Sequence, residues 1–205
     1  MAVNMALKRA KKAARRKAAL AERGRTQALD TSLAGRVRVA AGSSVYHCLV
    51  SECLFENGIG TLTLARGIPG GQFSAAVFLL DTFCLGVKDA FFRRLSAEDL
   101  VDLVEAINAT DRLVSVEPDY ARKLLLELVA WSRSLGLAPH PDFAVVETLF
   151  GDVSAAACDA TFQFGCDGKV LYVPGPTESP TMIRRRIELL RKRLGDDGLE
   201  LVTTA

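Results

Sequence analysis

The stretch of residues 77–92 constrains the fold more than any other part of the chain. It begins with an unbroken apolar run, Val77–Leu80, which is typical of a strand that is buried on both faces. Near its end, Phe91 and Leu95 are spaced one helical turn apart, and this spacing predicts that a helix begins here. We therefore expect a strand-to-helix junction over residues 81–86.

The segments before this stretch have the pattern of strands. Residues 45–50 are rich in aliphatic and aromatic side chains, and residues 59–65 alternate threonine with leucine, as a half-exposed strand does. Residues 73–80 form the next apolar segment, and the glycine-rich residues 67–71 before it are typical of a turn. These patterns predict an antiparallel β-meander.

Local capping signals predict the helices that follow. Ser96 with an acid at Asp99 is a capping pair, and Gly136 occupies the position where glycine commonly ends a helix. The last helix has an apolar stripe at 4-3-4 spacing and ends at Gly195. The expected helices begin after Ser96, at Pro118, near Asp142 and at Pro180.

Residues 161–173 are expected to form a β-hairpin around the turn Asp167-Gly168, because glycine accepts the positive φ of such a turn. The predicted fold class is α+β: an antiparallel β-meander plus a C-terminal β-hairpin, packed with about four to five helices. We assign residues 36–205 to one globular domain. Residues 1–35 are interpreted as a basic N-terminal arm and linker, flexible or conditionally helical.

The N-terminus carries the strongest functional signal. The net charge of the chain is +2, but residues 1–38 hold eleven basic and two acidic side chains (+9), which leaves fifteen basic and twenty-two acidic side chains (−7) elsewhere. Such an arm favours nucleic acid or a ribonucleoprotein as partner, and a solubilising tail and an acidic membrane surface are the alternatives. The side chains expected to contact phosphates are Lys8, Arg9, Lys11, Lys12, Arg15, Arg16, Lys17, Arg23 and Arg25.

Cys84 is the best candidate for a reactive residue. A thiol just before a helix would meet free backbone N–H groups and the helix dipole, which favour the thiolate. His140 could serve as its base, with Asp81 or Asp142 to orient the imidazole. The competing interpretation, which we favour, is that Cys84 is a small buried hydrophobe between Phe83 and Leu85.

Other sites find little support. The five cysteines are scattered without a CxxC pair, which argues against a zinc site and a disulfide framework and favours reduced thiols in the cytoplasm. The glycine-containing turns join strand to strand, so they are not phosphate loops, and no cofactor is expected. No apolar run approaches the ~20 residues of a membrane-spanning helix.

These observations lead to three hypotheses for function. The first is a non-enzymatic accessory protein that docks on nucleic acid or a ribonucleoprotein through the basic arm. Because aromatic residues make up only 7% of the chain, this binding is expected to be electrostatic and largely independent of sequence. The second hypothesis is a cysteine-dependent enzyme centred on Cys84, and the third is a protein–protein interaction module.

Overall fold

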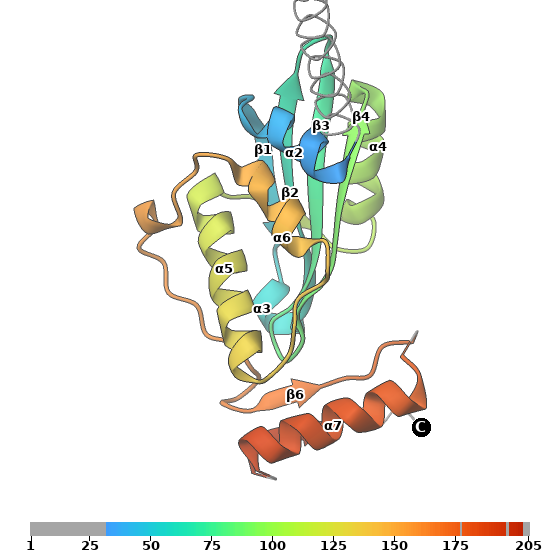
Figure 1. Cartoon of the computed structure of the whole chain (residues 1–205), viewed down its shortest axis with the longest axis vertical. Coiled ribbons are helices and arrows are strands. Elements are labelled where there is room, and N and C mark those ends of the chain that lie inside the picture. The colour runs from blue at the N-terminus through green and yellow to red at the C-terminus, as the bar shows by residue number, and fades with distance from the viewer. Residues whose placement is uncertain (1–31, 177, 196, 203–205) are drawn as a thin grey trace, which may run out of the picture.

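The protein is described by a computed structural model that covers residues 32–176, 178–195 and 197–202. The nine basic residues proposed for the arm lie outside the described residues. Among those described, helices and strands are mixed, and five strands form one antiparallel sheet (Figure 1). The order in the sheet is β4-β3-β2-β1-β5, with β1 Val45–Ser51, β2 Ile59–Ile68, β3 Gln72–Asp81, β4 Gly86–Leu95 and β5 Leu113–Ser115.

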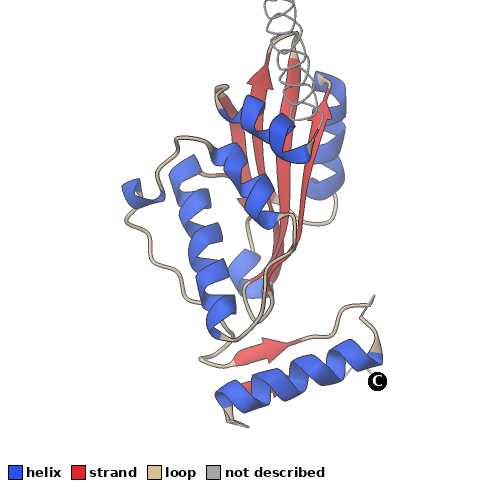
Figure 2. Ribbon diagram, viewed as in Figure 1, coloured by secondary structure: helices blue, strands red, loops and turns tan. Residues whose placement is uncertain are grey.

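The helices cover both faces of this sheet (Figure 2). On one face lie α2, α5, α6 and the 3-10 helix η1, whose apolar residues share the main hydrophobic core with β1–β4. On the other face α4 packs Leu100 against Ala65 and Ala75. The bounds are α2 Leu33–Ala41, α3 Leu54–Asn57, α4 Ala97–Asn108, α5 Pro118–Ser134, α6 Phe143–Val146, η1 Glu147–Phe150, η2 Ala155–Ala157 and α7 Pro180–Leu194.

The apolar run at residues 77–80 is a strand covered on both faces, as its sequence predicts. On the face of α5 and α6, Phe78 and Leu80 are fully buried, and the Phe78 ring lies 6.1 Å from that of Phe143. On the other face Val77 is buried and Leu79 is half-buried. The predicted β-meander is present, since β1 to β4 pair in chain order.

The predicted strand-to-helix junction is wrong. Residues 86–95 form β4, which pairs antiparallel with β3 along its whole length, so the segment before it is a hairpin turn. Phe91 faces Val77 and Phe92 enters the core with Ala76, as the alternation of a strand requires. The four-residue spacing of Phe91 and Leu95 fits a helix and a strand equally, because four is also an even number.

The expected boundary between linker and domain, at residue 36, falls inside a helix. Residues 33–41 form α2, with Ser32 as N-cap, whose Oγ accepts from the Gly35 N–H at 3.0 Å. Val37 and Ala40 are buried in the main core. The apolar stripe of this helix is short, and alanine, glycine and arginine make up most of its sequence, which is why it resembles a linker. The folded part therefore begins at least three residues before the expected boundary at residue 36.

The C-terminal part contains a βαβ unit instead of the predicted hairpin. The turn at Asp167-Gly168 is present, but beyond a single bridge from Cys166 to Lys169 it joins no pair of antiparallel strands. Strand β6 (Val170–Tyr172) pairs in parallel with β7 (Leu199–Leu201), and α7 connects them. Parallel strands need such a crossover. The residues before the turn run along α5, where Phe164 stacks near Trp131.

The other helix predictions are confirmed. Ser96 and Asp99 form the capping box of α4, and α5 begins at Pro118. Gly136 follows the end of α5 with φ +86°, the left-handed conformation that glycine adopts readily. Helix α7 begins at Pro180 after the N-cap Ser179 and packs its apolar stripe into a second hydrophobic cluster with β6 and Leu135.

Candidate functional site

Cys84 lies in the buried turn between β3 and β4, and not at the start of a helix. Its side chain is completely buried. Burial, together with the negative charge of Asp81, raises the pKa of the Cys84 thiol to about 12. The thiolate is the nucleophile, so a thiol with this pKa is inert at neutral pH. The environment is that of a small packed hydrophobe, and the setting assumed for a cysteine enzyme is absent.

Asp81 organises this turn. Its Oδ1 accepts hydrogen bonds from the backbone N–H groups of Phe83 (3.1 Å) and Cys84 (2.8 Å). Burial raises the pKa of the Asp81 carboxyl, and the hydrogen bonds and the charge of Lys88 act in the opposite direction. The carboxylate thus accepts from two N–H groups that no backbone carbonyl binds in the turn, so Asp81 has a structural role.

The turn is also held from outside. The Thr82 N–H donates to Gly58 O, and the Gly165 N–H donates to Thr82 O, both at 2.8 Å. The Leu171 N–H of β6 donates to Phe83 O at 3.2 Å, which joins the turn to the C-terminal unit. Every one of these contacts uses backbone atoms, so the turn is part of the framework of the fold.

His140 comes near this turn from the loop after α5. Its backbone N–H donates to Val87 O at 2.9 Å, and its Nε2 lies 3.6 Å from Asp89 Oδ1. Asp142 contacts the imidazole through its backbone, because the Asp142 N–H donates to His140 Nδ1 at 3.3 Å. This hydrogen bond does not involve the Asp142 carboxylate. The three sequence candidates are therefore gathered around one hairpin tip, but the imidazole faces Asp89 and the thiol is enclosed.

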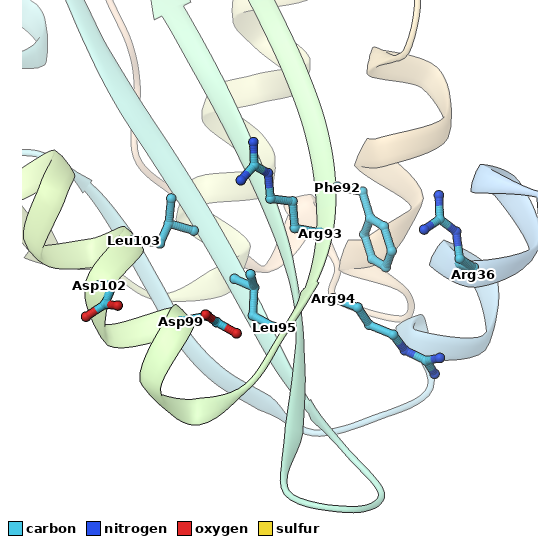
Figure 3. Close-up of a pocket in the computed structure, with 8 residues that line it drawn as sticks. All are labelled: Arg36, Phe92, Arg93, Arg94, Leu95, Asp99, Asp102 and Leu103. Atoms are coloured by element: carbon cyan, nitrogen blue, oxygen red, sulfur yellow. The ribbon is translucent and has the colours of Figure 1, made fainter.

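A second group of residues forms an exposed basic surface beside α2. Arg36 projects from α2, and Arg93 and Arg94 project from opposite faces of β4 (Figure 3). Together with Phe92 and Leu95 they line a shallow hollow of about 620 Å³. We call Arg36, Arg93 and Arg94 the arginine surface. It lies on the folded part of the chain close to where α2 follows the arm.

The cations of the arginine surface are available to a ligand. None of the three has a carboxylate within 4.0 Å among the residues that the structure describes. Instead Arg36 lies over the Phe92 ring at 5.8 Å and Arg93 over the Phe91 ring at 5.4 Å. Asp99 and Asp102 border the hollow on the α4 side, and Asp99 is engaged by Ser96 in the capping box (Figure 3).

Sequence reasoning missed this surface because it placed its residues in other elements. Arg36 was expected at the edge of a linker, and Arg93 and Arg94 on a helix. The pair of adjacent arginines after two phenylalanines was the available signal, since neighbouring residues of a strand point to opposite faces. On α7, Arg186 is bound to Glu178.

Comparison with known proteins adds no relative: no family model, curated protein or solved structure matches the chain. Across residues 32–202, apart from 177 and 196, no helix has the length and apolar character needed to cross a bilayer. Within the same residues no three histidine, cysteine, aspartate or glutamate side chains are grouped so that they could hold a metal ion. The site must therefore be interpreted from its own geometry.

Proposed function

We propose that the protein is a non-enzymatic accessory factor that docks on nucleic acid or a ribonucleoprotein through its basic arm and the adjoining arginine surface. The observation that carries this proposal is the continuity of positive charge. The arm, with nine candidate phosphate contacts, leads into α2, and Arg36 of α2 lines the same hollow as Arg93 and Arg94, which extend from opposite faces of β4. Cations without carboxylate partners are thus found on the folded part next to the arm.

The physical basis of such docking is the release of counterions. Each phosphate that a lysine or arginine neutralises frees a condensed cation, so affinity falls steeply as salt rises. Arginine suits this task because its planar guanidinium meets phosphate oxygens with two parallel hydrogen bonds. Phe91 and Phe92 lie beneath Arg93 and Arg36, so the arginine side chains are supported by the sheet surface.

The state of Cys84 favours this class of function over a thiol enzyme. An enzyme that used Cys84 would need access for the substrate and a lowered thiol pKa. The side chain is 0% exposed, and the pKa is raised to about 12. The non-enzymatic hypothesis needs neither property.

The test is the salt dependence of binding to fluorescently labelled single-stranded RNA and duplex DNA. If about six phosphates are engaged, log K for duplex DNA falls with log salt at a slope near roughly −5. Deleting residues 1–30 is expected to flatten most of this slope and to leave the melting temperature nearly unchanged, because the deletion spares the N-cap Ser32. The triple variant R36Q/R93Q/R94Q is expected to reduce the slope by up to about 3.

A matched variant removes three exposed cations elsewhere, R112Q/R133Q/K169Q. It lowers the net charge by the same amount but lies away from the arginine surface, so we expect a smaller change in slope. Equal binding by the full chain and by the chain without residues 1–30 at every salt concentration would refute the role of the arm. Equal slopes for the two triple variants would remove the arginine surface from the proposal.

A further inference from the structure

A cavity of about 340 Å³ lies between the β3–β4 hairpin tip, the loop after α5 and the start of α7. This volume is in the range of pockets that hold small molecules. Three buried aliphatic side chains, Leu85, Val87 and Leu137, form part of its wall, together with Met182 of α7. Its polar lining consists of Lys88, His140, Glu178 and Arg186. Apolar walls with a few convergent polar groups are typical of a binding site.

A β-bulge places Lys88 at this cavity. Leu79 pairs with Asp89 and Leu80 pairs with Val87, so Lys88 is an extra residue opposite the β3 strand. The bulge lets both Val87 and Ala90 enter the core although they are three positions apart. Bulges of this kind redirect a side chain and occur often beside functional sites. The Lys88 ammonium has no hydrogen-bond or salt-bridge partner among the described residues.

The carboxylate in the cavity is already neutralised. Glu178 accepts hydrogen bonds from the Tyr172 hydroxyl and from Arg186 Nη1, one on each of its oxygens. Burial and the hydrogen bond to Glu178 raise the pKa of Tyr172 to about 12, so the phenol keeps its proton and remains a donor. The Glu178 side chain is only 9% exposed. Among the residues that line this cavity, Lys88 is therefore the cation that no lining carboxylate neutralises, and its charge acts on Asp81, which lines the neighbouring hollow.

We propose that this cavity binds a small organic molecule with one carboxylate and an apolar body. Lys88 would bind the carboxylate, and Leu85, Val87, Leu137 and Met182 would contact the hydrocarbon part. The charges of Arg186 and Glu178 cancel, so the lining carries about one surplus positive charge, which matches a carboxylate better than a doubly charged phosphate. The site is separate from the arginine surface and does not depend on its role.

A neighbouring hollow of about 280 Å³ offers a contrast. Lys88 also borders it, but there the lining includes Asp81, together with Phe83, Pro174 and Val173. An acidic side chain in the wall disfavours an anion. The proposed ligand is therefore assigned to the cavity beside Met182 and His140.

The test titrates the full chain with hexanoate, benzoate and phenylacetate, with the corresponding amides as neutral controls, and follows amide resonances by NMR. Ligands of this size bind at about millimolar concentration when they fit a pocket. We expect at least one carboxylate to bind about tenfold more tightly than its amide. Lys88→Met is expected to lower the affinity for that carboxylate by about tenfold. Lys169→Met, which changes an exposed lysine elsewhere, is expected to leave this affinity unchanged.

Two filling variants locate the ligand without altering a charge. Ala138 is exposed and lines only the proposed cavity, whereas Val173 is 42% exposed and lines only the neighbouring hollow. Ala138→Phe is expected to abolish binding, and Val173→Phe is expected to preserve it. Failure of every carboxylate to bind, equal binding of acid and amide, or loss of binding in Val173→Phe alone would overturn the proposal.

Discussion

The two turns of the β2–β3–β4 sheet carry out different tasks. The turn between β2 and β3, Pro69–Gly71, is exposed, and a methyl group added at Gly70 or Gly71 would meet no atom within 4 Å. The turn between β3 and β4 is enclosed by α5, β6 and the segment before β6. Each contains a glycine with positive φ, +69° at Gly71 and +74° at Gly86. The same backbone conformation thus occurs in an exposed turn that only reverses the chain and in a buried turn that packs against other elements.

The difference shows that the surroundings of a turn decide how far its residues can vary. At the open turn only the backbone conformation restricts the residue. At the closed turn, Cβ atoms are excluded as well, because a methyl group at Gly86 would lie 2.5 Å from Ser132 Oγ. Substitutions at three sites of the closed turn, each with a counterpart at the open turn, test this contrast, beginning with the largest expected effect.

Replacing the two glycines by alanine is the most direct test. Gly71→Ala is expected to cost about 1 kcal/mol, which is the strain of an L residue at positive φ. Gly86→Ala carries the same strain and must also displace Ser132, so we expect roughly 2–4 kcal/mol in total. Urea denaturation of both variants measures the difference. Costs that agree within about 0.5 kcal/mol would mean that the closed turn can relax, and the contrast would fail.

Removing the Asp81 carboxylate is expected to have the second largest effect. Asp81→Ala leaves the N–H groups of Phe83 and Cys84 without their acceptor, which costs about 1–3 kcal/mol in a buried site. Asp81→Asn keeps an acceptor oxygen and should cost less. At the open turn, Gln72→Ala is expected to change the unfolding free energy by less than about 0.5 kcal/mol.

The pH dependence sharpens this prediction. Burial raises the pKa of Asp81 in the folded state, so the folded chain binds more protons than the unfolded chain just above the ordinary aspartate pKa of about 3.9. The stability from protonated Asp81 is complete below that value and is lost as the pH rises through the folded-state pKa. Asp81→Asn removes this loss. Its stability relative to the wild-type chain should increase as the pH rises above about 4, and parallel stability curves would contradict the assignment.

The smallest expected effect concerns Cys84. Iodoacetamide at neutral pH is expected to leave Cys84 unmodified until the protein unfolds, while the exposed Cys53 reacts in the folded chain. A cysteine placed at the open turn by Gln72→Cys should react as fast as Cys53. Cys84→Ser is expected to be less stable than Cys84→Ala by about 1 kcal/mol, because a buried hydroxyl lacks a sure partner. Rapid labelling of Cys84 in the folded protein would reverse the interpretation of the closed turn.

Elements with local signals could be predicted from the sequence. The starts of α4, α5 and α7 are encoded by Ser96, Pro118 and Ser179-Pro180, and the structure begins each helix there. Capping hydrogen bonds join residues that are close in sequence, so these helix starts can be recognised without knowledge of the fold.

Elements that depend on distant partners could not be predicted in the same way. The parallel pairing of β6 with β7 is decided by strands on either side of α7, and β4 is decided by its ladder with β3. The arginine surface could not be predicted for the same reason. The arginine surface needs Arg36 to be on a helix and Arg93 on a strand, and neither assignment is visible from short-range spacing.

The closed turn also has a consequence for the order of folding. Its covering groups, the N–H of Gly165 and the N–H of Leu171, come late in the chain, whereas β1 to β4 are consecutive. A ribosome releases the N-terminal part first, so the sheet can pair while β6 is still being synthesised. During that interval Cys84 and Leu85 lack the cover that Val170, Tyr172 and Leu190 supply, so this hairpin tip stays accessible to chaperones and to wrong partners.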